Sequence, residues 1–249
     1  MKRKNILITG ASSGLGKGMA VEFAKQGYNL ALCARRVDRL EQIRSELLQI
    51  NPNIRIWIRP LDVNQHDDVF EVFNKFHQEM GEINRVIINA GMGKGASIGT
   101  GYFQANRQTA ETNFVAALAQ AEAAMEIFRA QNHGHLVTIS SISAVRGFRR
   151  AMTVYAATKA AITSLSEGIR VDVMNTPIKV SCIHPGFIRS EINETVEKVP
   201  FIVDTETGCK ALVKAINKEK ANSFVPGWPW SIVQGLLRVI PSKMLRSFS

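Results

Sequence analysis

Cysteine is scarce in this chain. Its 249 residues include three cysteines, Cys33, Cys182 and Cys209, and none belongs to a Cys-x-x-Cys pair. An odd number of widely spaced cysteines is typical of buried thiols in a reduced cytoplasmic protein, and it argues against a disulfide or zinc framework. His133 and His135 have no cysteine or carboxylate neighbour at ligand spacing. We therefore expect a cytoplasmic protein without a metal site.

Long apolar runs are also lacking. No stretch approaches the roughly 18 uninterrupted apolar residues that a membrane-spanning helix needs. The apolar run from Ile6 to Ile8, after a positively charged start, is too short for a signal-peptide core, so we expect no secretion signal. The chain has no internal repeat or low-complexity linker, and its length suffices for one large core. We expect a single domain over residues 1–249, with residues 228–249 as its C-terminal extension.

Acidic residues are outnumbered by basic ones. The chain has 31 Lys and Arg against 21 Asp and Glu, for a formal net charge of +10. Nucleic-acid binding is one interpretation of this charge, and a solvated or cofactor-attracting surface is the other. The basic residues form small separate groups, without a helix-turn-helix, zinc-finger or aromatic-rich RNA-binding motif. We therefore expect no nucleic-acid partner.

Short apolar, β-branched runs alternate with helical patterns along the chain. The runs predicted to form strands are 6–9, 29–33, 54–58, 86–89, 136–140, 179–184 and 224–225. Several of these runs lack polar alternation, as expected of strands buried on both faces of a parallel sheet. Between them, Val69, Val72, Phe73 and Phe76 recur at helical spacing. The alternation predicts an α/β fold: a doubly wound, Rossmann-like three-layer sandwich with a mainly parallel sheet of about seven strands.

Two predicted helices are unusual in composition. Residues 112–128 are apolar almost all round, and residues 155–173 are rich in Ala, Ser, Thr and Gly. A helix that is apolar on every side must be covered on every side. The cover could be the domain itself or a second subunit. We expect a homo-oligomer, with a dimer preferred and a tetramer as the alternative, because the long segment after the last strand could obstruct a tetramer.

The first predicted strand runs directly into a glycine-rich turn. The sequence from Thr9 to Gly16 is Thr-Gly-Ala-Ser-Ser-Gly-Leu-Gly, and a helix is predicted from about Lys17 to Lys25. Glycines permit a tight turn and a close approach of the backbone to a pyrophosphate, whose charge is favoured at a helix N-terminus. The pattern therefore predicts a phosphate-binding loop.

The end of the second predicted strand indicates which nicotinamide cofactor is preferred. An acid about 20 residues beyond the glycine loop usually binds the ribose 2′-hydroxyl of NAD. Ala34 stands at that position here and is followed by Arg35 and Arg36. An arginine can grip a 2′-phosphate with two hydrogen bonds, which favours NADP(H). The alternative is that both arginines begin a solvated helix ending near Gln49.

Tyr155 and Lys159 have the spacing of an acid–base pair. Residues four apart share one face of a helix. A phenol with a pKa near ~10 is a poor proton donor or acceptor at neutral pH. A nearby ammonium group favours the phenolate and lowers that pKa, so Tyr155 could serve as a general acid or base.

Further motifs follow the other predicted strands. They are Asp62-Val63, Asn89-Ala90-Gly91, Ser141, and Pro185-Gly186-Phe187-Ile188. Asn113 lies within an apolar helix, where its amide needs a hydrogen-bond partner. Together with the glycine loop and the Tyr-x-x-x-Lys pair, these motifs resemble the short-chain dehydrogenase/reductase superfamily over nearly the whole chain.

The resemblance implies how the cofactor is held. Asp62 and Val63 match the pair that contacts the adenine ring, and residues 89–91 match the Asn-Ala-Gly after strand four, although Ile88 stands where a second Asn is common. Residues 185–188 match the turn beside the nicotinamide. The expected cofactor contacts are Gly10, Ser12, Ser13, Gly14, Leu15, Gly16, Arg35, Arg36, Asp62, Val63, Asn89, Ala90, Gly91, Tyr155, Lys159, Pro185, Gly186 and Ile188.

The resemblance also implies a catalytic tetrad of Asn113, Ser141, Tyr155 and Lys159. Ser141 would hold the substrate oxygen, and Tyr155 would transfer the proton. Lys159 would bond the nicotinamide ribose and lower the pKa of Tyr155. Asn113, at a kink in its helix, would anchor a water that relays protons through Lys159. Ser140 and Ser143 are alternatives to Ser141, whose separation of 14 from Tyr155 exceeds the usual 13 by one.

The substrate side is less defined. Arg146, Arg149 and Arg150 could capture an acidic group or form a basic surface turn. Residues 189–200 are expected to form a mobile lid. Residues 228–248 combine apolar side chains with Arg238, Lys243 and Arg246, and three alternatives are open. They could contact an anionic membrane peripherally, cap a greasy substrate channel, or pack on the core or a second subunit.

The expected function is an oxidoreductase that transfers a hydride between NADP(H) and a small-molecule carbonyl or alcohol substrate, with a lipophilic ketone or aldehyde preferred. Tyr155 would be its general acid or base. One alternative is an NAD-dependent alcohol dehydrogenase on the same fold. Another is a non-catalytic nucleotide-sensing or interaction protein, against which the intact tetrad argues.

Overall fold

The computed structural model describes residues 4–190 and 201–248. Its strands are β1 (Asn5–Thr9), β2 (Asn29–Ala34), β3 (Ile56–Pro60), β4 (Arg85–Ile88), β5 (Gly134–Ile139), β6 (Ile178–Pro185) and β7 (Asn222–Val225). Its α-helices are α1 (Gly14–Lys25), α2 (Val37–Ile50), α3 (His66–Met80), α4 (Phe103–Ala110), α5 (Ala116–Ala130), α6 (Met152–Asp172), α7 (Thr205–Asn217), α8 (Gly227–Val239) and α9 (Ser242–Phe248). A π-helical turn, η1 (Glu111–Val115), precedes α5, and a 3-10 turn, η2 (Ile142–Val145), follows β5.

The strands form one seven-stranded sheet in the order β3-β2-β1-β4-β5-β6-β7. Every pairing between neighbouring strands of this sheet is parallel. The predicted doubly wound α/β fold is confirmed. The strand order reverses direction between β1 and β4, and ligands of such sheets bind beyond the carboxyl ends of the strands near that reversal.

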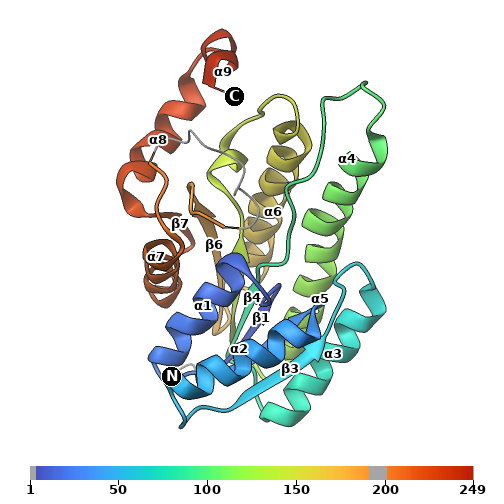
Figure 1. Cartoon of the computed structure of the whole chain (residues 1–249), viewed down its shortest axis with the longest axis vertical. Helices are drawn as coiled ribbons and strands as arrows, with labels where there is room; N and C mark the ends of the chain where they lie inside the picture. Colours follow the sequence, from blue (N-terminus) through green and yellow to red (C-terminus); the bar gives the residue numbers. More distant parts are fainter. Residues whose placement is uncertain (1–3, 191–200, 249) are drawn as a thin grey trace.

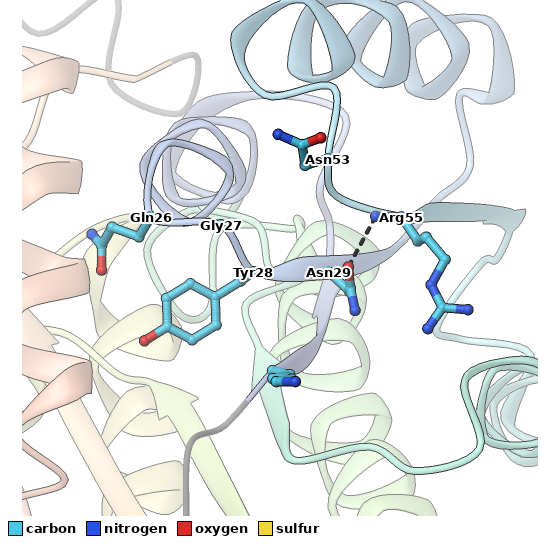
Figure 2. A pocket seen from close by; sticks show the side chains of 7 residues that line it. Gln26, Gly27, Tyr28, Asn29, Asn53 and Arg55 are labelled. Carbon is cyan, nitrogen blue, oxygen red and sulfur yellow. Dashed lines mark hydrogen bonds between the residues drawn. The ribbon is translucent and has the colours of Figure 1, made fainter.

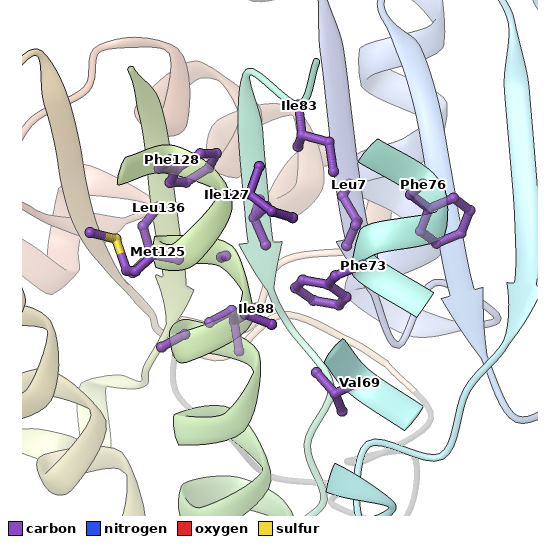
Figure 3. Close-up of a cluster of buried hydrophobic side chains, with 14 of the residues drawn as sticks. Leu7, Val69, Phe73, Phe76, Ile83, Ile88, Met125, Ile127, Phe128 and Leu136 are labelled. Atoms are coloured by element: carbon purple, nitrogen blue, oxygen red, sulfur yellow. The ribbon is translucent and has the colours of Figure 1, made fainter. Parts of the chain in front are cut away.

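Helices cover both faces of the sheet and make a three-layer sandwich (Figure 1). Alternate residues of each strand point to opposite faces, so Leu7 joins a core beneath α3, α5 and α6, whereas Ile6 and Ile8 join a core beneath α1, α2 and α7. Figure 3 shows the first core, where Phe73 and Phe76 of α3 lie beside Leu7 of β1. The two cores fix the sheet and hence the positions of the strand ends.

Several predicted boundaries need correction. The third strand spans Ile56–Pro60, two residues later than the predicted 54–58, because the Asn29 side chain accepts a hydrogen bond from Arg55 N at 2.9 Å and holds the preceding residues in a turn. The helix predicted at 155–173 begins at Met152. Tyr155 is therefore the fourth residue of α6, in its first turn.

The C-terminal segment forms two helices beyond β7. Figure 1 shows α8 and α9, in red, at one end of the sandwich, away from α3. Trp230 of α8 and Leu245 of α9 are buried, so part of this segment packs on the core. Among the described residues, no helix combines the length and the apolar character needed to cross a membrane.

The three cysteines are buried and form no disulfide, as expected. Burial raises the pKa of the Cys33 and Cys209 thiols, the latter to about 12. Both thiols are therefore protonated and inert at neutral pH.

We predict that Phe73→Ala lowers the free energy of unfolding by about 3–5 kcal/mol. The Phe73 ring is fully buried, so truncation loses its transfer free energy and leaves a cavity between α3 and the sheet. Urea denaturation followed by circular dichroism measures the change. Val171→Ala, at an exposed position of α6, is the control and is expected to stay within ~0.5 kcal/mol of wild type. A Phe73→Ala loss no larger than that of the control would contradict the assigned core.

Candidate active site

The glycine loop connects β1 to α1 at the carboxyl edge of the sheet. Gly10 has a φ of +63°, and a Cβ there would lie 2.8 Å from Ala90 Cα. A Cβ on Gly16 would lie 2.3 Å from the Gly10 carbonyl oxygen. Neither position accepts a side chain, so the loop folds tightly against the end of β4. Gly14 and Leu15 begin α1 directly beyond the turn.

Asn89 and Thr9 fasten the loop to the strand beside it. Thr9 Oγ1 accepts hydrogen bonds from Asn89 N at 3.1 Å and Ala90 N at 3.2 Å. The Asn89 Nδ2 group donates to the Thr9 and Gly10 carbonyl oxygens at 3.0 and 3.3 Å. The Asn-Ala-Gly motif therefore holds the glycine loop in place from the side of β4.

The start of α1 fits an anion. Ser13 is the N-cap residue, its side chain caps no backbone N–H, and the first turn of the helix has no acidic residue. The backbone N–H groups at this end carry a partial positive charge. An uncapped, acid-free helix start beside a glycine-rich loop fits the pyrophosphate of a dinucleotide.

Arg36 lies over the same loop. Its guanidinium group donates to Ser13 Oγ at 2.7 Å and to Ser12 Oγ at 3.2 Å. Arg36 caps the start of α2, two residues after the end of β2, and both Arg35 and Arg36 are exposed. Two hydroxyls and a guanidinium group thus meet at the place where the sequence predicts a 2′-phosphate.

The residues after β3 lie on the same side of the strand reversal as the glycine loop, at the edge of the sheet. Asp62 Oδ1 accepts hydrogen bonds from Asn64 N at 3.1 Å and Asn64 Nδ2 at 3.0 Å, and Val63 is buried. Asn64 Oδ1 in turn accepts from Thr112 Oγ1 at 3.1 Å. The loop after β3 is thereby tied to η1, the helical turn that carries Asn113.

Asn113 occupies the π-helical turn η1, so the predicted kink is present. Its Oδ1 accepts from Met92 N at 2.8 Å, and its Nδ2 donates to Met92 O at 2.9 Å and to Thr158 Oγ1 at 3.3 Å. These bonds supply the partners that the buried amide was expected to need. They also fix the backbone beyond Gly91 against α6.

Ser141, Tyr155 and Lys159 come together at the carboxyl end of β5. Ser141 caps η2 by accepting from Ser143 N at 3.1 Å, and the Tyr155 phenol hydrogen-bonds to the Ser141 side chain. The Lys159 ammonium nitrogen donates to Ile139 O at 2.8 Å and lies 5.7 Å from the centroid of the Tyr155 ring. The three side chains form one cluster.

Ser140 and Ser143 do not make the same contact. Ser140 Oγ donates to the Lys159 carbonyl oxygen at 2.9 Å, which turns it toward α6. Ser143 Oγ donates to Ser141 Oγ at 3.0 Å. Of the three serines, Ser141 is the one whose hydroxyl hydrogen-bonds to the Tyr155 phenol.

Burial has the largest effect on the pKa values of Tyr155 and Lys159. It raises the pKa of Tyr155, against a smaller lowering by the Ser141 hydrogen bond. Burial likewise lowers the pKa of Lys159 to about 8. The net direction for Tyr155 is opposite to the lowering expected from Lys159, because the ammonium group bonds to a backbone carbonyl instead of the phenol.

The turn after β6 closes the site. Gly186 N donates to Val225 O at 2.8 Å, which joins the Pro185-Gly186 turn to β7. The Trp230 indole packs directly on Gly186, where a Cβ would lie 2.1 Å from the ring. The Trp230 ring also meets Phe187 edge-on with the centroids 5.5 Å apart, and the side chain of Ile188 is buried.

Thr158 and His184 were missed in the sequence, and Trp230 was considered only within residues 228–248, without its contact to Gly186. Thr158 accepts from Asn113, and His184 Nδ1 lies 3.4 Å from the Ser141 carbonyl oxygen. The position of His184 directly before Pro185, at a strand end, was a usable signal. Trp230 gave none, because its contact with Gly186 joins residues 44 positions apart through the tertiary fold.

Arg146 has a structural contact that the sequence did not predict. Its guanidinium group donates to Leu237 O at 2.9 Å, to Ile240 O, and to Ser242 Oγ at 3.5 Å. Arg146 therefore binds the carbonyl end of α8 and secures the C-terminal segment to the loop after η2. The predicted lid at 189–200 lies mostly outside the described residues.

A polar cavity of about 290 Å³ lies at the opposite edge of the sheet, where the strands begin (Figure 2). Gln26, Tyr28, Asn29, Asn53 and Arg55 are among its lining residues. It is separate from the cluster around Tyr155. Among the described residues, no three His, Cys, Asp or Glu side chains converge as metal ligands do.

Comparison with known sequences identifies relatives over the whole chain. Residues 4–200 match the short chain dehydrogenase family. An uncharacterized oxidoreductase of Mycobacterium tuberculosis is 48% identical over 99% of this chain and 98% of its own length. Another, from Myxococcus xanthus, is 30% identical over 98% of this chain and 95% of its own length.

Solved structures share the fold. ElxO with bound NADP superposes with a TM-score of 0.80 at 24% identity, covering 92% of this chain and 100% of ElxO. Xylitol dehydrogenase with bound NAD+ superposes with a TM-score of 0.79 at 20% identity, covering 91% of this chain and 98% of its own. Both cofactors thus occur among proteins of this architecture.

We predict that Lys159 contributes a rise in the stability of the protein between pH 8 and pH 10.5, separate from the opposite effect of the raised Cys33 and Cys209 pKa values in the same window. The folded-state pKa of about 8 lies below the ordinary 10.5, so the unfolded chain binds more protons in this window. Each pKa unit is worth about 1.4 kcal/mol, so the whole gain approaches ~3 kcal/mol.

Urea denaturation of wild type and Lys159→Met across this window measures the effect. The variant should lack this part of the rise, whatever its stability at pH 7. Parallel curves for the two proteins would show that Lys159 keeps its ordinary pKa in the folded state.

Proposed function

The chain belongs to the short chain dehydrogenase family, and on that premise we propose that it is an NADP(H)-dependent oxidoreductase acting on a carbonyl or alcohol group. The observation that carries the proposal is the cluster of Ser141, Tyr155 and Lys159 beside the loop fastened by Asn89. A phenol with a serine and an amine at its side has the groups required for moving a proton to or from an oxygen.

The preference for NADP(H) rests on the end of β2. Ala34 leaves no carboxylate to repel a 2′-phosphate, and Arg36 is already held over the loop by Ser12 and Ser13. A guanidinium group with two hydroxyls beside it offers charge-assisted hydrogen bonds to a phosphate monoester. The pyrophosphate would lie at the start of α1, with Asp62 and Val63 toward the adenine.

Each residue of the cluster has a defined task in this proposal. When bound, the reduced nicotinamide supplies the hydride. Ser141 donates a hydrogen bond to the carbonyl oxygen and orients it toward Tyr155. The Tyr155 hydroxyl gives its proton to that oxygen as negative charge develops there, and takes one back in the reverse direction. Burial of the phenol keeps it protonated until that moment.

Lys159 and Asn113 would support the proton transfer. The Lys159 ammonium group, 5.7 Å from the phenol ring centroid, would stabilise the phenolate that remains. Asn113 holds Met92 and Thr158, so it keeps the loop after β4 in register with α6. A proton relay through Lys159 remains part of the proposal.

A lipophilic substrate is favoured by the aromatic side chains near the Pro-Gly turn. Trp230 packs edge-on against Phe187 and Phe201, with centroids 5.5 and 6.1 Å apart. Its Nε1 is buried without a hydrogen-bond partner among the described residues, so the indole contributes to the site through its apolar ring. We further propose a cytoplasmic homodimer, with exposed faces of α5 and α6 as the contact.

We predict that Arg36→Ala raises the Kd for NADPH roughly 10- to 100-fold and leaves the Kd for NADH unchanged. The variant loses the charge-assisted bonds that the 2′-phosphate alone can accept. Arg35→Ala is expected to act in the same direction. Quenching of tryptophan fluorescence by each cofactor measures the Kd. Arg39→Ala, an exposed neighbour on α2, serves as the control. Equal weakening of NADPH and NADH would refute the assigned role of these arginines.

We predict that Tyr155→Phe lowers kcat roughly 100- to 10,000-fold while NADPH binding persists. The substitution removes the hydroxyl proton and little else. Oxidation of NADPH with lipophilic ketones and aldehydes, followed by absorbance, measures turnover. Tyr102→Phe removes a hydroxyl from an exposed residue and should change nothing. Undiminished turnover by Tyr155→Phe would overturn the mechanism.

A further inference from the structure

The C-terminal part of the chain has an unusual charge pattern. Glu219 is the last acidic residue, and residues 220–249 contain only basic charges. The basic side chains of α8 and α9 are Arg238, Lys243 and Arg246, and all three are exposed. This region therefore contributes a concentrated share of the net charge of +10.

One face of α8 is apolar and exposed. Ile232, Leu236 and Val239 lie at positions i, i+4 and i+7 of the helix and are 60%, 54% and 75% exposed. Trp228, just before the regular part of the helix, is 74% exposed. We call these four residues the apolar stripe. The opposite face of α8 is occupied, because Trp230 is buried against Gly186.

A basic hollow lies next to the apolar stripe. It has a volume of about 560 Å³ and lies between the loop after η2 and α9. Arg146, Arg149 and Arg246 contribute to its wall, together with the apolar side chains of Phe148 and Leu245. Arg146 also bonds to the Leu237 and Ile240 carbonyl oxygens, so the hollow adjoins the C-terminal end of α8, where Val239 ends the stripe.

We propose that the apolar stripe and the basic hollow form a docking surface for an anionic phospholipid bilayer. Trp228 and the aliphatic side chains of the stripe would enter the interface between headgroups and acyl chains. The exposed basic side chains would meet the lipid phosphates. An exposed apolar helix face with flanking Lys and Arg and no acidic residue is the composition that such interfaces favour.

A second copy of this chain is a poorer occupant of the same surface. In a two-fold symmetric dimer the patch would face itself. Arg238, Lys243 and Arg246 would then approach their own copies, and residues 220–249 offer no carboxylate to pair with them. A bilayer with anionic headgroups supplies the missing charge.

Docking would also orient the active site. Because Trp230 packs on Gly186, the helix that bears the stripe covers the turn beside the proposed nicotinamide site. A lipophilic substrate could then reach the site from the membrane. The docking proposal does not depend on that substrate, since vesicle binding is measured without turnover.

Sedimentation of the full chain with vesicles tests the proposal. The protein should bind vesicles that contain phosphatidylglycerol, bind phosphatidylcholine vesicles far more weakly, and dissociate as salt is raised. Tryptophan emission should shift to the blue on binding, and Trp228→Phe should lose most of the shift. Failure of wild type to bind phosphatidylglycerol vesicles at low salt would overturn the proposal.

Matched variants separate the apolar stripe from net charge. Ile232→Glu with Leu236→Glu should weaken vesicle binding at least tenfold. Ile50→Glu with Ile98→Glu makes the same charge change at exposed apolar positions far from α8 in the chain, and should weaken vesicle binding much less. Equal losses would mean that only net charge matters, against the proposal.

Two further readouts complete the test. Lys243→Gln with Arg246→Gln should weaken binding roughly fivefold for each charge removed and should flatten the salt dependence. Size-exclusion chromatography reports the oligomeric state of every variant. If the stripe variant dissociates an oligomer while vesicle binding is unchanged, the surface is a contact between copies and the bilayer proposal is wrong. Circular dichroism confirms that each variant is folded.

Discussion

The close approach of the first glycine turn to the end of β4 is the contact on which the site depends. Parallel pairing sets Ile8 beside Ile87, so the two strands end together. Asn89 then donates two hydrogen bonds to Thr9 across the gap, and Gly10 leaves room for Ala90. A side chain at Gly10 would separate the two strand ends. The uncapped start of α1 and the loop beyond Gly91 would then no longer be held at fixed positions relative to each other.

Desolvation is the second constraint, and it acts on the chemistry. The same burial raises the pKa of Tyr155 and lowers that of Lys159, so both groups are driven toward their neutral forms. A neutral phenol is ready to donate a proton, whereas a lysine with a pKa of about 8 retains most of its charge at pH 7. A charged group that approaches Lys159 will therefore shift the protonation of both residues.

What the sequence could predict was local or repeated in pattern. The alternation of strands and helices predicted the three layers, and short motifs at strand ends located Ser141, Asn89 and the glycine loop at one edge. Contacts between segments far apart in the chain could not be predicted from the sequence. Trp230 on Gly186, and the grip of Arg146 on the end of α8, arise only when residues 44 and 91 positions apart are packed together.

The same limit explains why the C-terminal composition was ambiguous. A helix that is apolar on nearly all sides is compatible with a core, a channel cap or a membrane contact. Only the structure shows which of its faces are buried and which are exposed, and this distinguishes the alternatives. Trp230 and Leu245 account for one face, because they pack on the protein. They leave Ile232, Leu236 and Val239 outside, where water contact with apolar surface costs roughly 25 cal/mol for each Å². Arg146 bonds to the end of α8 and holds the helix in this orientation, so the apolar face stays exposed to water. A fixed apolar surface with a basic border is better explained by a partner than by the fold.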